Sequence, residues 1–321
     1  MKKNLLYLFT VLCTLSFFTA CSDDDDDKSD DGWKAVSATY KAETLILNGT
    51  EGKASSTETV KVDATSAEAA SVTLGNVVVG EPEVKVDAKL TKAADDSYTL
   101  TGENSNSDRV VSIQGTVKSG KLTITASVKI TSPVVGAWSL TIANGMADVF
   151  ANIEPTSEAS AMISGMVKQQ LGALIAQKVE SVTVTYGEDG KLGIAFKTTA
   201  AGNSSVAGII GLLDPRYYVK DGQLYLAINK SIMTMGETMM GAEMAAAIKS
   251  LLVENGEYYA LPINMKVENN SAQFYVSKDL ITKVLPVVIP LLPAEVAPYI
   301  QMVTPVIESA TVVDFGLGFT K

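Results

Sequence analysis

The side chains that most often carry enzyme chemistry are scarce in this chain. It has 321 residues and no histidine, so it lacks the Ser-His-Asp triad, the usual general base near neutral pH and the commonest zinc ligand. The P-loop, Gly-x-Ser-x-Gly and His-Glu-x-x-His motifs are also missing. Carboxylates are plentiful, but Glu188, Asp189 and Glu268 occupy predicted turns, where acids are common. We expect no catalytic residue, metal site or cofactor, and a carboxylate-dependent hydrolase is the enzymatic alternative.

The thiol of Cys21 is the reactive group whose surroundings predict a definite chemistry. The chain opens with Lys2 and Lys3, continues with an uncharged, mostly apolar run over 4–20, and places small Ala20 before the cysteine. This is the three-part plan of a secretory signal peptide, so we expect residues 1–20 to be removed. A membrane span is the alternative, although the run is short for one. The other cysteine, Cys13, would leave with the signal.

The residues around Cys21 resemble two bacterial export motifs. Phe18-Thr19-Ala20-Cys21 resembles a lipoprotein lipobox, which implies lipid attachment to Cys21. The next residues resemble the surface-export signal of Bacteroides-type surface lipoproteins, namely Ser22, Asp23, Asp24, Asp25, Asp26 and Asp27. The resemblance implies an outer membrane lipoprotein exposed at the cell surface. A periplasm-facing anchor and a plain solvated acidic spacer are the alternatives.

Net charge and turn residues indicate the partners and the domain limits of the rest of the chain. The formal net charge is −10 and no basic stripe is present, so we expect no nucleic-acid partner. Residues 21–35 are predicted to be the lipidated cysteine and an acidic linker, residues 36–132 one domain, and residues 133–321 a second, with Pro133 and Gly136 marking the change.

The first domain shows alternating, Thr- and Val-rich segments typical of strands. They are 39–47, 57–63, 70–74, 76–80, 83–90, 97–102, 109–117 and 121–131. Turn signals separate them, including Gly75-Asn76 and Ser119-Gly120. This pattern predicts an eight-stranded antiparallel barrel, with a two-layer sandwich as the alternative. The order Tyr40-Lys-Ala-Glu-Thr-Leu, NVVVG and Ile113-Gln-Gly-Thr-Val-Lys-Ser-Gly-Lys-Leu resembles the calycin-like β-barrel domain of Bacteroides-type lipoproteins.

The second domain mixes helices with hairpins. Apolar spacing predicts a helix over 158–179, and a second is predicted over 241–256, ending at Asn255-Gly256. Hairpins are predicted around 188–190, 221–222 and 268–270, and a last strand over 311–319. The overall class is therefore mainly β, α+β, with a second antiparallel barrel or curved sheet decorated with helices.

Two resemblances bear on this second domain. Gly136-Ala137-Trp138 resembles the Gly-x-Trp of lipocalin-type domains, which implies a Trp that plugs one barrel end. Residues 180–320 are similar to the C-terminal part of an uncharacterised Bacteroides-type lipoprotein family, through a Val-Thr-Val-x-Tyr-x-x-Asp-Gly-Lys hairpin and a Tyr-rich Asp-Gly hairpin. Together they favour a lipocalin-like α+β domain.

Aromatic side chains are the candidate ligand-binding groups, because a ring with a polar tip suits sugars and partner proteins. They are Trp138, Tyr217, Tyr218, Tyr225, Tyr258 and Tyr259. Neighbours on a strand point to opposite faces, so one ring of the 217–218 pair is expected to face outward, unless one is core and the other covers the barrel surface.

Two apolar segments could also contact a ligand or partner. Residues 280–307 contain five prolines, which predict short helices broken at the prolines and packed on the sheet, or a lid over an apolar cavity. Residues 231–244 contain five methionines, which suit core packing or a pliable contact surface better than Cu(I).

The residues thus predict a lipid-anchored cell-surface protein that acts without catalysis. The first hypothesis is a binding module for an extracellular nutrient, glycan or small apolar ligand. The alternative is a structural or accessory scaffold subunit that docks to other surface proteins through the apolar segments.

Overall fold

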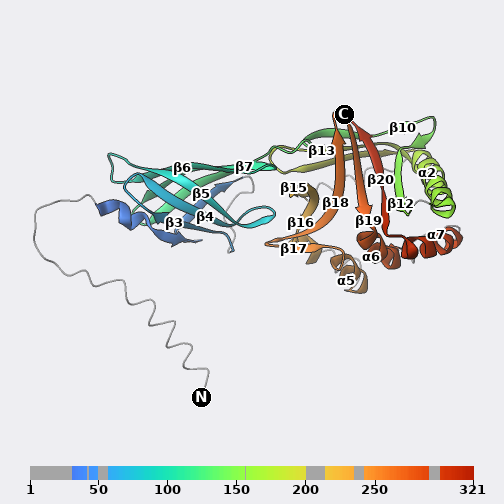
Figure 1. The fold of residues 1–321 in the computed structure, drawn as a ribbon. Helices are drawn as coiled ribbons and strands as arrows, with labels where there is room; N and C mark the ends of the chain where they lie inside the picture. Colours follow the sequence, from blue (N-terminus) through green and yellow to red (C-terminus); the bar gives the residue numbers. More distant parts are fainter. Residues whose placement is uncertain are drawn as a thin grey trace, which may run out of the picture. The chain divides into compact units, whose positions relative to one another are not determined.

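The structure, a computed structural model, describes residues 31–41, 43–49, 57–155, 157–199, 214–234, 242–288 and 297–321. The predicted signal peptide, Cys21 and the acidic run from Ser22 to Asp27 lie outside these residues. From Trp33 to Lys321 the chain forms one compact unit. It is mainly β, built on two large sheets (Figure 1). A short 3-10 helix, η1 (Asp31–Val36), precedes the first strand.

Sheet A is an eight-stranded, nearly closed, barrel-like sheet, as the alternation predicts. Its strands are β1 (Ala38–Tyr40), β2 (Leu45–Gly49), β3 (Thr59–Ala64), β4 (Ala69–Val78), β5 (Glu81–Lys92), β6 (Tyr98–Ser105), β7 (Arg109–Lys118) and β8 (Lys121–Ile130). Their order is β1-β3-β4-β5-β6-β7-β8-β2, antiparallel except for the parallel pair β2–β8. The edge strands β1 and β2 are consecutive in the chain, so the short turn between them holds the two edges of the sheet close together.

Alternating side chains supply the interior of sheet A. Along β5 the residues from Val84 to Leu90 alternate between buried apolar and exposed polar side chains. Strands β7 and β8 repeat the pattern, with Val111, Ile113, Leu122 and Ile124 buried. Burying each such side chain contributes about 1.5–3 kcal/mol, so the alternation selects one face as the core.

Two local predictions for sheet A are wrong. Residues 39–47 form two strands rather than one, because the chain turns where Leu45 N–H donates to Lys41 C=O (2.8 Å). The predicted turn at Gly75-Asn76 is instead a bulge within β4, where pairing with β5 shifts between Gly75 and Val78 and Asn76 has φ of 57°. A Cβ on Gly75 would lie 2.4 Å from Thr59 Oγ1, so the close strand approach requires glycine here.

Sheet B is a curled antiparallel sheet that carries the helices. Its strands are β9 (Gly136–Leu140), β12 (Val149–Glu154), β13 (Val179–Tyr186), β14 (Leu192–Thr198), β15 (Arg216–Lys220), β16 (Gln223–Asn229), β17 (Val253–Asn255), β18 (Tyr258–Glu268), β19 (Ser271–Ser277) and β20 (Val312–Thr320). The main order is β14-β13-β9-β20-β19-β18-β16-β15, and β12 also pairs with β20 and β17 with β18. A small hairpin, β10 (Ile142–Ala143) and β11 (Met146–Ala147), lies between β9 and β12.

The two edge strands of sheet B meet at one end. Leu192 N–H donates to Pro215 C=O (3.0 Å), and Tyr217 N–H donates to Gly190 C=O (2.8 Å). These bonds join β14 to β15, so the curled sheet is closed at this end. The three predicted hairpins, β13–β14, β15–β16 and β18–β19, are confirmed in position.

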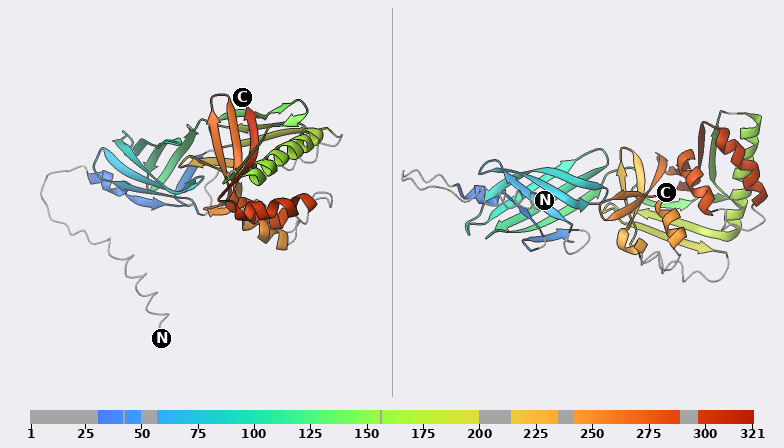
Figure 2. Two further views of the ribbon diagram at one scale, coloured as in Figure 1. Left: turned by 45° about the vertical axis from the view of Figure 1, so that its right-hand side comes forward. Right: turned by 90° about the horizontal axis from the view of Figure 1, so that it is seen from below.

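The helices that accompany sheet B include α2 (Glu158–Lys178), α5 (Ala242–Lys249), α6 (Lys278–Val288) and α7 (Ala297–Ser309) (Figure 2). A capping box between Ser157 and Ser160 starts α2, as the predicted boundary requires. Helices α2, α6 and α7 pack over the apolar residues of β12 and β20. No helix among the described residues is long and apolar enough to cross a membrane.

Two helix predictions are corrected. Helix α5 ends at Lys249, and Asn255 belongs to β17, so Asn255-Gly256 turns between two strands instead of ending a helix. Pro286 and Pro305 lie inside α6 and α7, so neither breaks its helix. Each lies in the second half of a helix that packs on the sheet, and this tertiary packing outweighs the cost of the lost backbone bond.

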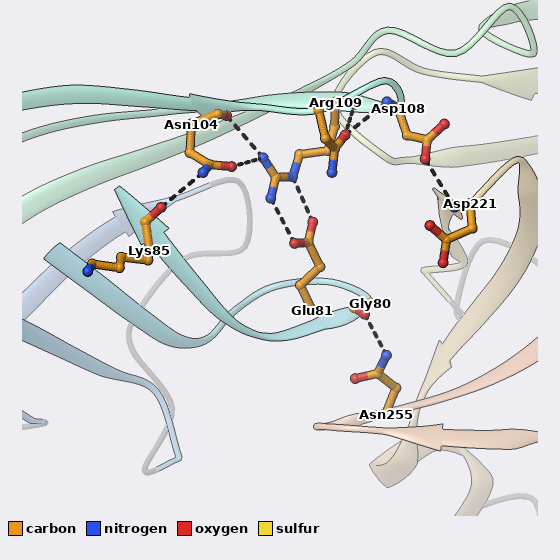
Figure 3. Close-up of polar contacts among 9 residues, drawn as sticks. Gly80, Glu81, Lys85, Asn104, Asp108, Arg109, Asp221 and Asn255 are labelled. Carbon is orange, nitrogen blue, oxygen red and sulfur yellow. Dashed lines mark hydrogen bonds and ion pairs between the residues drawn. The ribbon is translucent and has the colours of Figure 1, made fainter. Parts of the chain in front are cut away.

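Polar contacts join the β4–β5 turn and β7 of sheet A to sheet B (Figure 3). Arg109 donates from Nε and Nη2 to the two oxygens of Glu81 (2.6 and 2.7 Å). Asn255 Nδ2 donates to Gly80 C=O (2.7 Å), and Asp221 N–H donates to an oxygen of Asp108 (3.2 Å). The β4–β5 turn is therefore bonded by Arg109 of sheet A and by Asn255 of sheet B.

Candidate functional site

Trp138 lies at the closed end of sheet B and is completely buried. Its Nε1 donates to Val134 C=O (2.6 Å), and the ring of Phe274 packs edge-on to it at 6.3 Å between centroids. Lys321 Nζ lies 4.4 Å from the centre of the indole, and also donates to Val135 C=O (2.8 Å). The indole therefore fills the sheet interior and offers no surface to a ligand.

Tyr217 and Tyr218 point to opposite faces of β15, as predicted, with one ring in the core and the other over the outer surface of the sheet. Both residues are buried, at 1% and 5% exposure. Tyr217 packs with Tyr186 inside sheet B, whereas Tyr218 packs outside it against Val79 of sheet A. The outward face of β15 is buried because sheet A covers it, a contact that the sequence of β15 does not reveal.

The other tyrosines do not gather into one platform. Tyr225 stacks on Tyr218, with ring centroids 4.7 Å apart. Tyr258 packs beside the same small cluster, and Tyr259 lies under two lysines, Lys230 and Lys249, whose ammonium groups are 5.5 and 5.7 Å from its ring centre. The structure thus brings together three of the six predicted aromatic residues, Tyr218, Tyr225 and Tyr258.

Burial perturbs the phenols of the sheet B interior. It raises the pKa of Tyr186 well above its usual value, and it does the same for Tyr217, with a further rise from the charge of Asp189. Tyr217 Oη donates to Gly187 C=O (2.6 Å), which fixes the ring at the closed end. These groups are neutral and structural near pH 7.

An apolar recess lies where the helices cover sheet B. We call it the helix groove. It has a volume of about 410 Å³. Its lining residues are Met166, Val167, Gln170, Leu171 and Leu174 of α2, Ile281 and Leu285 of α6, Val303, Thr304 and Ile307 of α7, and Phe315 of β20. The walls are thus helices, and a strand supplies the aromatic ring.

The position of Phe315 follows from the alternation of β20. Val313, Phe315, Leu317 and Phe319 share one face of this strand. Val313 packs under the helices and Phe319 packs in the interior near Trp138, and both are buried. Phe315 lies between them and is only half-buried. The groove therefore opens on the same sheet face that forms the core.

Helix α2 has apolar side chains on two faces. Gly172 is buried, and a Cβ on it would lie 2.8 Å from Ala147 C=O, so the face around Gly172 packs tightly on the β10–β11 hairpin and β12. Ile163 lies about 180° round the helix from Gly172 and is buried on the groove side, with Ile281 and Ile307. Leu171 and Leu174 belong to the other face and remain 40% and 47% exposed. A helix that merely covers a sheet needs one apolar face. The second face lines the helix groove.

The size of the helix groove indicates what it can hold. A cavity of about 150 Å³ binds benzene, so on the same ratio the groove has room for about sixteen heavy atoms. Its volume lies within the range of small-molecule sites.

The remaining candidates for chemistry add no centre. No group of three or more Asp, Glu, His or Cys side chains that could hold a metal occurs in the described parts of the chain. Met233 is buried, whereas Met235, Met239 and Met240 lie outside the described residues. Among the residues that the structure describes, no acidic residue lines the groove.

Sequence reasoning identified the 280–307 segment as a possible cover of an apolar cavity, but it did not identify α2 as the opposite wall. The sequence did contain a sign of this wall, because residues 158–179 have more apolar side chains than one buried face of a helix can accommodate. Comparison of the chain with protein-family models, curated proteins and solved structures gives no match.

Proposed function

We propose that this chain is a lipid-anchored cell-surface protein that binds a small apolar molecule in the helix groove. The observation that carries the proposal is the second apolar face of α2, set opposite α6 and α7 above Phe315. Leaving such a face in water has a free-energy cost of about 25 cal/mol per Å² of apolar surface. A ligand that covers it recovers that cost.

A small molecule accounts for the site better than a glycan. Sugar sites use exposed aromatic rings beside polar groups, whereas Tyr217 and Tyr218 are buried and Phe315 lies among aliphatic side chains. The groove volume lies within the range of small-molecule sites. A lipid anchor on Cys21, followed by the acidic run as a surface-export signal, would place the groove at the cell surface, where it meets extracellular molecules.

Binding is tested with the chain from Ser22 to Lys321, which contains the whole compact unit Trp33–Lys321. The probe is N-phenyl-1-naphthylamine, an uncharged dye whose fluorescence rises in apolar surroundings. We expect saturable binding that Leu174→Asp weakens by about tenfold or more, because a carboxylate is placed in the apolar wall.

Ala173→Asp is the matched control. Ala173 is exposed on the same helix but does not line the groove, so this variant carries the same new charge in a different direction. Equal losses in the two variants, or no saturable dye signal in the parent chain, would reject the groove as the binding site.

The anchor is tested separately in cells. Cys21→Ala should release the protein from the membrane fraction, and external protease should digest the parent protein on intact cells. Retention of the variant in the membrane would refute lipid attachment, and protection from protease would refute surface exposure.

A further inference from the structure

The residues that line the helix groove also indicate the charge of its ligand. Of the eleven described residues that line it, nine are apolar and two, Gln170 and Thr304, are polar but uncharged. We propose that the ligand is an uncharged amphiphile, with an apolar body against Phe315 and a single neutral hydrogen-bonding group near Gln170. This proposal rests on the proposed function, because it concerns the same groove.

Most charged residues of the three helices are directed away from the groove, and one that is not, Lys278 of α6, donates from Nζ to Glu308 C=O and Ala310 C=O (2.9 and 2.5 Å). On a helix each residue turns by about 100°. Relative to the mean direction of the lining residues, Lys168 on α2 and Lys283 on α6 are displaced by more than about 120° and Glu308 on α7 by about 90°. All three are exposed. Water rather than the groove therefore solvates their charges.

Lys178 of α2 is a second cation on the groove side of these helices. It lies one turn beyond Leu174 on the same side of α2, and it is exposed. It also belongs to the last turn of the helix, where a cation compensates the unpaired carbonyls and an incoming anion would be disfavoured. A ligand that lies wholly within the groove would place its head group beside the lining residues and not beside Lys178.

An ionic head group is expensive in such surroundings. A charge moved out of water needs a partner of opposite sign and hydrogen bonds to offset the lost hydration. Gln170 offers both an amide donor and an acceptor, which suit a hydroxyl, an amide or an ester carbonyl. The lining therefore discriminates among ligands of equal length by their head groups.

The test compares 1-dodecanol, dodecanoate and dodecylammonium as competitors of N-phenyl-1-naphthylamine on the chain from Ser22. At about pH 8 both ionic probes carry their full charge. We expect the alcohol to displace the dye at a concentration at least about tenfold lower than either ion. An ion that competes as well as the alcohol overturns the proposal, and a preference for the carboxylate would assign its head group to Lys178.

A pair of isosteric variants locates the head group. Gln170 is exposed at the edge of the groove, so Gln170→Glu adds a negative charge at the mouth of the groove and should make dodecylammonium a better competitor than the alcohol. Gln169→Glu makes the same change on the next residue, which is turned by about 130° from the groove and should leave the order of the three probes as in the parent. Identical behaviour of the two variants would overturn the placement at Gln170.

The experiment separates this inference from the function beneath it. If the dye binds and the alcohol is not preferred, the uncharged-ligand inference fails while the groove remains a binding site. If neither the dye nor any of the three probes binds, the proposed function itself fails.

Discussion

Loss of the buried guanidinium of Arg109 should destabilise the fold strongly. The Arg109 side chain is 6% exposed and that of Glu81 is 28% exposed. Arg109 bonds both oxygens of Glu81 and also donates from Nη1 to Asn104 C=O (3.0 Å). Arg109→Met leaves the Glu81 carboxylate without its cation. Breaking a buried pair in this way costs about 3–5 kcal/mol, and we take the lower end because Glu81 retains some hydration.

The measurement is urea unfolding of the chain from Ser22, followed by tryptophan fluorescence. A loss of about 3 kcal/mol lowers the midpoint by about 1 M if the slope is about 3 kcal/mol per M. The two tryptophans report on different sheets, since Trp33 packs against the core of sheet A and Trp138 lies in sheet B. Phenylalanine at one or the other position isolates each signal.

A double-mutant cycle decides whether the pair itself is responsible. Glu81→Leu combined with Arg109→Met removes both charges, so the double variant should be more stable than the sum of the single losses predicts, by about 2 kcal/mol. The reasoning is refuted if Arg109→Met costs less than about 1 kcal/mol, or if the two single losses simply add.

Three further outcomes follow from particular contacts. Gly80→Ala should lower the free energy of unfolding in urea by about 2 kcal/mol or more. Gly80 has φ of 89°, and a Cβ there would lie 2.4 Å from the ring of Tyr218. Unchanged stability would contradict this packing. Lys278→Met should lower the free energy of unfolding by about 1 kcal/mol, because Lys278 Nζ donates to Glu308 C=O and Ala310 C=O at the end of α7. Hydrogen exchange in the last turn of α7 should become faster. Exchange at the parent rate would show that these two hydrogen bonds do not hold the end of the helix. Tyr186 and Tyr217 have raised pKa values in the folded state, so they retain protons that the unfolded chain loses above about pH 10, and stability should fall by about 1.4 kcal/mol per pH unit for each residue. Phenylalanine at either position should flatten that alkaline slope, and a parent slope of zero between about pH 10 and 11 would contradict the burial argument.

Most strands could be predicted because their information is local. Ser119 and Gly120 adopt φ of 50° and 71°, and Asp221 and Gly222 adopt 53° and 78°, as two-residue hairpin turns demand. The alternation beside these turns then sets the register. The barrel-like closure of sheet A was also predictable, since eight short alternating strands need a common interior.

The features that escaped prediction depend on distant parts of the chain. The burial of Tyr218 requires Val79 of sheet A, which no pattern within β15 indicates. Pro286 and Pro305 were expected to break helices, but packing on the sheet retains them within α6 and α7. The helix groove needs three helices and one residue of β20, so its residues are separated by more than a hundred positions.

The place of β20 in sheet B has a consequence for the order in which the sheet can be completed. This strand follows all the others that the structure describes, yet it lies inside the sheet, between β19 on one side and β9 and β12 on the other. Until it arrives, β9 and β19 cannot be bridged, and the apolar faces of both halves stay open to unwanted association. A variant shortened to end at Thr311 would lack this bridging strand, and proteases should digest the region of sheet B more readily than in the parent chain.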